Sequence, residues 1–315
     1  FLASSTLRNL VLFDEAESLA PITTMTVADL ANEETPQVYC LCGRGNRSSL
    51  RVLRHGAAVT EIVVSEMPGH PSAVWTVKER QDSPYDRYIV VSFTNATLVL
   101  SIGETVEEVT DSGFLATAPT LDVVLLADNT LLQIHANGIR HIRSDRRINE
   151  WKTPGKKQIE KASANASQVT VALAGGEIIY FELGPTGVLT EIATRELGVE
   201  VACLDVGQIP RGRAKSMFLA VGGWDDTVRL LTLEEKGGLA QKSTLQLPAR
   251  AESLSLVEMA VEASEGDEPS LGGAGGGGGG APSLFLHCGL ANGVAQRAAV
   301  DPVTGTLSDT RTRFL

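Results

Sequence analysis

The strongest chemical signal in this sequence is a basic stretch, residues 140–161. It holds eight Lys and Arg residues against three Asp and Glu residues, a net charge of +5, whereas the whole chain has a formal net charge of −11. Trp151 lies within it, and an aromatic side chain among cations is typical of an interface anchor or an RNA contact. The plainer alternative, which we prefer, is a solvated sheet edge whose charges discourage edge-to-edge pairing. The residues of the candidate contact surface are Arg140, Arg143, Arg146, Arg147, Trp151, Lys152, Lys156 and Lys157.

The histidines and cysteines do not form a recognisable catalytic or metal-binding pattern. None of the five histidines has a partner at a spacing suited to metal binding or general-base catalysis, and His135 and His141 are interpreted as polar residues that flank a turn. Cys40 and Cys42 could form half of a metal site, but the other two cysteines, Cys203 and Cys288, are isolated. We therefore expect four buried free thiols, which weakly indicates a reducing compartment.

A glycine-containing segment, residues 43–48, loosely resembles a phosphate-binding loop. The run that follows it is typical of a strand, so no helix N-terminus would be present to hold a phosphate. We predict a hairpin turn there. The sequence as a whole predicts no catalytic residue, no metal site, no cofactor and no small-molecule substrate.

Composition and charge narrow the class of protein. The chain has 315 residues, 43% of them apolar and 21% charged, which is the balance of a soluble globular protein. No apolar run approaches the roughly 18 residues of a membrane span, so we predict no membrane partner. The acidic balance argues against a dedicated nucleic-acid binder. Because the chain starts with Phe1 and ends within a strand-like run, we expect a fragment of a longer protein.

A repeated pattern of paired apolar runs predicts the fold. Each pair is joined by a tight turn, and the pairs recur about every 35 to 66 residues. Third runs follow at 139–143, 188–192 and 307–312, the first of them after Asn137-Gly138, a dipeptide typical of a type I′ turn. The six pairs are 37–42 with 49–54, 88–93 with 97–102, 123–126 with 131–135, 169–173 with 177–183, 218–221 with 227–233, and 284–290 with 294–300.

Serial hairpins at this period are typical of propeller blades. We predict an all-β chain, a β-propeller of four-stranded blades, seven-bladed with six blades visible. Two stacked β-sandwich domains are the alternative fold. Residues 1–30 are predicted to be a lead-in strand segment from a preceding propeller and residues 31–315 the β-propeller domain. Within that domain, 262–283 is acidic and then glycine-rich, and we expect a flexible insertion there.

Several strings resemble a known family. They are SSLRVLRHG at 48–56, VSFTNATLVLSIGETVEEV at 91–109, DSGFL at 111–115, GIRHIR at 138–143, NEWKTPGKK at 149–157 and SDTRTR at 308–313. Together they closely resemble the splicing factor 3b subunit 3 family. More distantly, they are similar to the large subunit of the damage-specific DNA-binding protein and to the largest cleavage and polyadenylation specificity factor subunit. The resemblance runs over residues 7–315 and implies the middle one of three propellers.

The resemblance implies a nuclear, non-enzymatic scaffold of the U2 small nuclear ribonucleoprotein, acting in branch-site recognition during pre-mRNA splicing. Implied partners are the other splicing factor 3b subunits, namely the HEAT-repeat subunit and a small zinc-finger subunit, with RNA contact indirect or weak. Alternatives are the adaptor propeller of a cullin ubiquitin ligase in the DNA-damage response and a polyadenylation-factor scaffold. A propeller enzyme would need carboxylates or histidines on the innermost strands. We expect those strands to contain Leu98, Leu131, Ile178 and Val228, among apolar or small neighbours.

Overall fold

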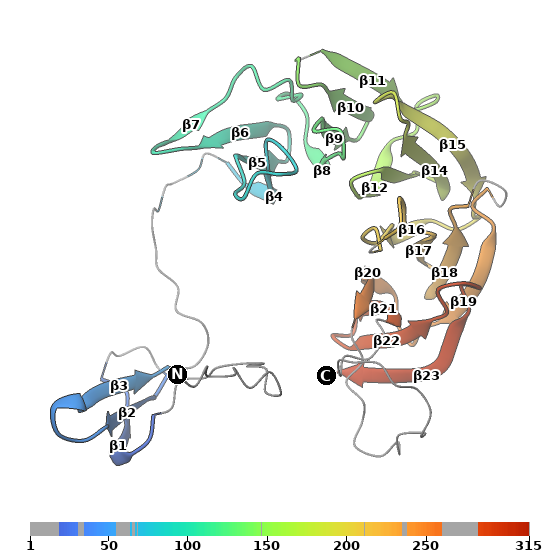
Figure 1. The fold of residues 1–315 in the computed structure, drawn as a ribbon. Helices are drawn as coiled ribbons and strands as arrows, with labels where there is room; N and C mark the ends of the chain where they lie inside the picture. Colours follow the sequence, from blue (N-terminus) through green and yellow to red (C-terminus); the bar gives the residue numbers. More distant parts are fainter. Residues whose placement is uncertain are drawn as a thin grey trace, which may run out of the picture. The chain divides into compact units, whose positions relative to one another are not determined.

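Strands account for nearly all regular structure in the part of the chain that is described. The computed structural model describes residues 19–30, 35–54, 64, 67, 69–145, 147–210, 212–234, 238–259 and 283–314. Within these ranges the helical element is a 3-10 turn at Gly45–Arg47, and no helix there is long and apolar enough to cross a membrane. Two compact units lie within residues 1–66 and 67–315 (Figure 1).

The first unit contains a three-stranded antiparallel sheet, made of β1 (Ile22–Ala28), β2 (Gln37–Cys42) and β3 (Ser49–Leu53). The segment between β2 and β3 is a hairpin turn, as predicted, and not a phosphate-binding loop. Gly43 begins this turn with φ +87°, and a Cβ there would lie against the Arg47 carbonyl. Glycine is required because other residues fit neither the conformation nor the close approach. The domain boundary between residues 30 and 31 stays a prediction.

The second unit contains five four-stranded antiparallel sheets in its described residues. The first two are β4 (Pro71–Val77), β5 (Tyr88–Phe93), β6 (Thr97–Ile102) and β7 (Val106–Glu108), then β8 (Thr120–Leu125), β9 (Leu131–His135), β10 (Gly138–Ile142) and β11 (Ile148–Lys152). The third is β12 (Ile159–Ala164), β13 (Gln168–Leu173), β14 (Glu177–Leu183) and β15 (Leu189–Glu196). The last two are β16 (Val201–Asp205), β17 (Phe218–Gly223), β18 (Thr227–Thr232) and β19 (Gln241–Gln246), then β20 (Ala251–Met259), β21 (Ser283–Leu290), β22 (Ala295–Val300) and β23 (Leu307–Phe314).

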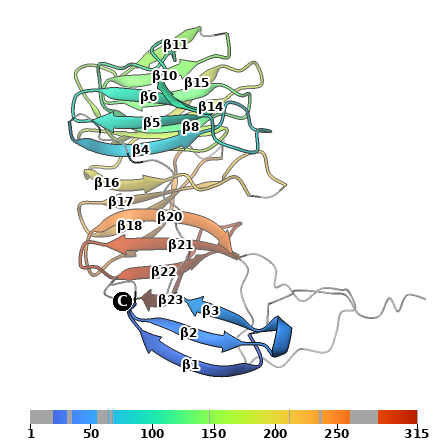
Figure 2. The same cartoon turned by 90° about the vertical axis from the view of Figure 1, so that its left-hand side faces the viewer.

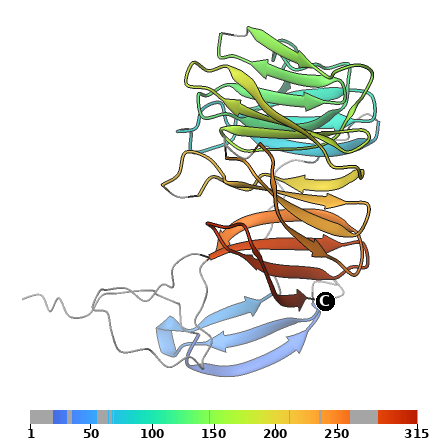
Figure 3. The ribbon, with the colours of Figure 1, turned by 90° about the vertical axis from the view of Figure 1, so that its right-hand side faces the viewer.

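The sheets of this unit follow one another along an arc, and each sheet is one blade. The first strand of every blade lies on the inside of the arc and the fourth on the outside (Figure 1). The first strands of successive blades contact one another, and Figures 2 and 3 show the β16–β19 blade stacked on the β20–β23 blade. This radial arrangement confirms the predicted β-propeller of four-stranded blades. That the propeller has seven blades stays a prediction.

The paired apolar runs are confirmed as strands, with bounds that differ by three residues or fewer from those predicted for the hairpin strands. The expectation for the innermost strands was wrong. Leu98, Leu131, Ile178 and Val228 lie on the second or third strand of their blades, whereas the innermost strands are β4, β8, β12, β16 and β20. The glycine-rich insertion predicted at 262–283 lies outside the described residues except for Ser283.

The core lies between neighbouring blades. Every residue of β13 and of β17 is buried, because these strands have a blade on each side. On β17, Leu219 and Val221 pack toward the preceding blade, and Phe218 and Ala220 toward the following one. Such a strand is apolar at consecutive positions, since both of its faces are removed from water.

Carboxylates on the innermost strands connect neighbouring blades. Asp205 of β16 accepts a hydrogen bond from the Leu256 backbone N–H of β20 at 2.6 Å and one from the Ser163 hydroxyl of β12 at 3.3 Å. Asp122 of β8 accepts hydrogen bonds from its neighbour's backbone N–H at 2.8 Å and from the Trp75 side chain of β4. The bonds of Asp205 to Leu256 and Ser163, and of Asp122 to Trp75, join the innermost strands of neighbouring blades.

Asp122→Asn should stabilise the protein near neutral pH and remove part of its pH dependence. Burial raises the pKa of Asp122 to about 6, above the value of about 4 in an unfolded chain. Between pH 4 and pH 6 the folded state therefore binds more protons than the unfolded state. The stability that the protonated Asp122 contributes is present below about pH 4 and is lost as the pH rises through about 6. We expect a gain of about 1–2 kcal/mol near neutral pH, measured by urea denaturation.

The matched control is Asp86→Asn, which changes an exposed carboxylate in the loop between β4 and β5. Its denaturation curves should keep the pH dependence of the unmodified protein. If the stability of Asp122→Asn depended on pH in the same way as that of Asp86→Asn, the raised pKa assigned to Asp122 would be contradicted.

Candidate interaction surface

The basic stretch forms the outer part of one blade and the connection to the next. Its first residues lie on β10 and β11, the third and fourth strands of the β8–β11 blade, and its last residues lead into β12. In the antiparallel register Arg140 faces Glu150, and Ile139 faces Trp151. The stretch is therefore divided between a sheet edge and a connecting segment.

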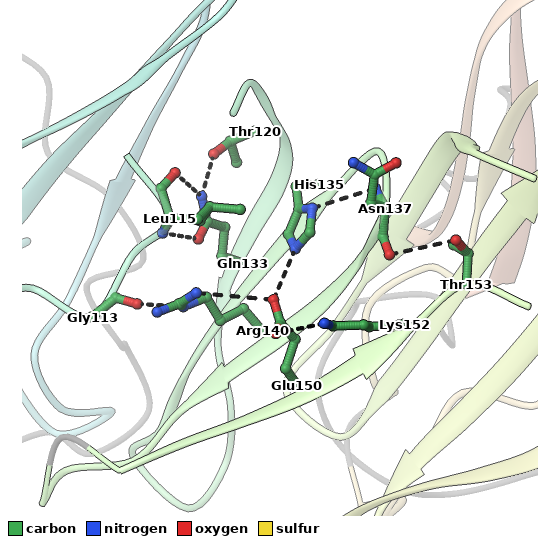
Figure 4. Close-up of polar contacts among 10 residues, drawn as sticks. All are labelled: Gly113, Leu115, Thr120, Gln133, His135, Asn137, Arg140, Glu150, Lys152 and Thr153. Atoms are coloured by element: carbon green, nitrogen blue, oxygen red, sulfur yellow. Dashed lines mark hydrogen bonds and ion pairs between the residues drawn. The ribbon is translucent and has the colours of Figure 1, made fainter. Parts of the chain in front are cut away.

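Glu150 is the centre of the polar contacts on the sheet edge (Figure 4). Its carboxylate lies 3.9 Å from Arg140 Nη1, 4.0 Å from Lys152 Nζ and 3.7 Å from His135 Nε2. Arg140 also donates from Nε to the Gly113 carbonyl at 2.7 Å, which attaches the loop before β8 to the strand. The Arg140 guanidinium thus lies near Glu150 of its own blade and is bonded to the connection from the preceding blade.

His135, at the end of β9, is buried and neutral and belongs to the polar contacts around Glu150. Its Nδ1 accepts a hydrogen bond from the Asn137 backbone N–H at 3.3 Å, so Nε2 has the proton and is directed at Glu150. Burial lowers the pKa of His135, and the Glu150 carboxylate opposes that shift. On the same blade, Gln133 bonds to the Leu115 backbone and the Thr120 hydroxyl, which holds the connection from the preceding blade.

Arg143 and Arg147 lie at the turn between β10 and β11. Arg143 donates from Nη2 to the Gly187 carbonyl of the next blade at 3.2 Å. Arg147 forms an exposed ion pair with Asp145 at 2.6 Å, and the backbone N–H and guanidinium of Arg147 hold the pKa of Asp145 below its usual range. Arg146 lies outside the described residues.

Trp151 packs between two blades. Its ring meets Phe181 of β14 edge to face at a centroid distance of 5.0 Å and is half-buried against the apolar cluster shared by the two blades. β10 and β11 approach each other closely here, and a Cβ on Gly138 would overlap the Trp151 carbonyl. Gly138 has no positive φ, so its glycine is explained by this contact, and the predicted type I′ turn is wrong.

The lysines of the stretch are exposed, as Arg147 is. Lys152 is 78% exposed at the end of β11, and Lys156 is exposed in the segment that follows. Lys157 Nζ lies 2.7 Å from Glu177 Oε2, and this hydrogen bond raises the pKa of Lys157. The structure thus brings Lys152, Lys156 and Lys157 to the solvent and engages Arg140, Arg143 and Trp151 in packing. The role of all these residues as a contact surface stays a prediction.

Sequence patterns alone did not indicate the buried polar groups. His135 ends β9 directly before the turn, as expected of a turn-flanking residue, but His135 and His141 are each only 3% exposed, which the sequence did not indicate. The His141 Nε2 lies 2.6 Å from the Thr130 hydroxyl. The four cysteines are free and buried, as predicted, and the described residues contain no cluster of three metal-ligating side chains.

Trp151→Ala should destabilise the protein by about 2–4 kcal/mol, because it removes a half-buried ring from the core between two blades. Urea denaturation and hydrogen exchange of β10 and β14 would measure this. Trp151→Phe, which keeps a ring against Phe181, is the control and should lose less. Unchanged stability of Trp151→Ala would contradict this packing role.

Comparison with known proteins identifies the family. The chain is 55% identical over its whole length to splicing factor 3B subunit 3 of Drosophila melanogaster, of which it covers 26%. It is 54% identical over 98% of its length to splicing factor 3B subunit 3 of Danio rerio and to spliceosome-associated protein 130 A of Arabidopsis thaliana, covering 25% of each. The chain thus spans about a quarter of the length of these curated relatives. Residues 59–315 match the family described as the RSE1/DDB1/CPSF1 second beta-propeller, and the chain belongs to that family.

Proposed function

We propose that this chain acts in a non-enzymatic protein-interaction scaffold of pre-mRNA splicing, with the role of a splicing factor 3b subunit in the U2 small nuclear ribonucleoprotein during branch-site recognition. The observation that supports this most strongly is the 55% identity, over the entire chain, to a protein named splicing factor 3B subunit 3. The site of action would be the nucleus. The proposed partners are the HEAT-repeat subunit and a small zinc-finger subunit of the same complex.

The use of titratable side chains supports a scaffold without chemistry of its own. Asp122 and Asp205, on the innermost strands where a propeller enzyme would place its catalytic groups, are bonded to neighbouring blades, Asp122 through the Trp75 side chain. His135 and His141 are buried within one blade. The two aspartates thus join neighbouring blades, and the two histidines bond within the β8–β11 blade.

The exposed lysines are the part of the basic stretch available for a contact. We expect this contact to be with protein, and any RNA contact to be indirect or weak. The chain has a net charge of −11, and phosphate binding requires a broad cationic face.

Affinity purification of the full-length protein from nuclear extract tests the proposed function. Mass spectrometry should recover the other splicing factor 3b subunits, and RNA sequencing should recover U2 small nuclear RNA. Recovery of a cullin without that RNA would overturn the proposal in favour of a ubiquitin-ligase adaptor. Recovery of polyadenylation factors without it would equally overturn the splicing role.

The double variant Lys152→Glu and Lys156→Glu tests the contact surface in the same purification. We expect recovery of a protein subunit to fall by about threefold or more, since reversed rim charges weaken association. The matched control reverses two exposed cations elsewhere, Arg44→Glu and Lys242→Glu, and should leave recovery unchanged. Equal recovery with both double variants would mean that the lysines only solvate the sheet edge.

A further inference from the structure

Trp224 is a large aromatic side chain that lies exposed in the turn between β17 and β18. Its side chain is 55% exposed. The β16–β19 blade has a neighbouring blade on each side, and the two apolar clusters that it shares with them do not include this ring. Tryptophan is among the side chains most enriched at the energetic centres of protein–protein contacts. The ring is therefore a candidate anchor for a partner.

The turn that contains Trp224 is held by the connections to both neighbouring blades. The Trp224 backbone N–H donates to the Glu200 carbonyl at 3.0 Å, in the segment between β15 and β16. The Asp226 carbonyl accepts a hydrogen bond from the Leu247 backbone N–H at 2.9 Å, in the segment between β19 and β20. Because the backbone of the turn is already bonded on both sides, binding at the ring orders few further groups.

One face of the Trp224 ring is covered by a cation. The Arg250 guanidinium carbon lies 4.0 Å from the ring centroid, and Arg250 Nε donates to Glu252 Oε1 at 3.1 Å. The Glu252 carboxylate thus compensates the charge of Arg250. Since the side chain remains 55% exposed with this face covered, the second face of the ring is open to solvent. The π-system of tryptophan attracts cations on either face.

The uncompensated charges of this turn and its connections are negative. Besides Arg250, the other cation of the turn is Arg229, which is paired with Asp225 at 2.5 Å. Glu200 is exposed and Asp226 half-buried, and neither forms an ion pair with a described residue. An exposed ring beside carboxylates without a counter-ion favours a cationic ligand.

We propose that Trp224 binds an arginine-containing segment of a partner protein. The partner's guanidinium stacks on the open face of the ring, opposite Arg250, and is attracted by Glu200 and Asp226. Arginine suits this place better than lysine, because its planar group stacks on aromatic faces and is more weakly hydrated. RNA bases also stack on tryptophan, but the RNA phosphates would approach the two uncompensated carboxylates. This surface shares no residue with the basic stretch, so the two are tested independently.

Fluorescence anisotropy with labelled octapeptides and the full-length protein tests the proposal. The peptides consist of Gly and Ser around a central pair of Arg, Lys, Glu or citrulline residues. Citrulline has the planar shape of arginine without its charge, so it separates stacking from the attraction of a cation. We expect the Arg peptide to bind about tenfold more tightly than the citrulline peptide and about threefold more tightly than the Lys peptide, and the Glu peptide to bind least.

Trp224→Leu places the result at this ring. It removes the aromatic face, keeps an apolar side chain, and should reduce the preference for Arg over citrulline to about twofold or less. Trp224→Phe keeps an aromatic face and should retain more of the preference. The matched control is Tyr85→Leu, which removes an exposed ring from the loop between β4 and β5 and should leave the preference unchanged.

Glu200→Lys tests the contribution of charge. It reverses one uncompensated carboxylate and should weaken binding of the Arg peptide by about threefold or more. Its matched control, Glu104→Lys, reverses an exposed carboxylate in the turn between β6 and β7 and should leave binding unchanged. The proposal is overturned if the Arg peptide does not bind, if the citrulline peptide binds equally well, if either variant behaves like its control, or if an oligouridylate displaces the Arg peptide.

Discussion

Each blade of residues 67–315 has apolar side chains on both faces, and this requires a neighbouring sheet on each side of an inner blade. The consequence is visible on β13 and β17, whose residues are all buried and alternate between two different cores. A single four-stranded sheet would leave one of these faces in water, at a cost proportional to the apolar area exposed. Radial stacking satisfies both faces at once, and the other features of this unit are arranged around it.

Polar groups are placed where the stacked faces end. On the inside of the arc, Asp122 and Asp205 use their oxygens to join innermost strands of adjacent blades. Between blades, Gln133 and Gln81 attach connecting loops to backbone groups. The basic stretch follows the same rule, that side chains satisfy backbone groups outside the strands. Arg140 and Arg143 donate to the carbonyls of Gly113 and Gly187. The cations, which are continuous in the sequence, are thus divided between those that support the fold and those that are exposed to solvent.

The sequence by itself determined the class of fold, because strand pairs separated by tight turns produce a pattern local enough to recognise without tertiary contacts. It also indicated buried free cysteines and the basic stretch. The innermost strands were not recognised, and their order within each blade was misjudged, since whether an apolar strand lies inside or in the middle depends on which sheets stack beside it. The burial of His135 and His141 and the packing of Trp151 on Phe181 were likewise decided only by tertiary structure. Trp151 and Phe181 are far apart in the chain, and only the packing of one blade against the next brings them together.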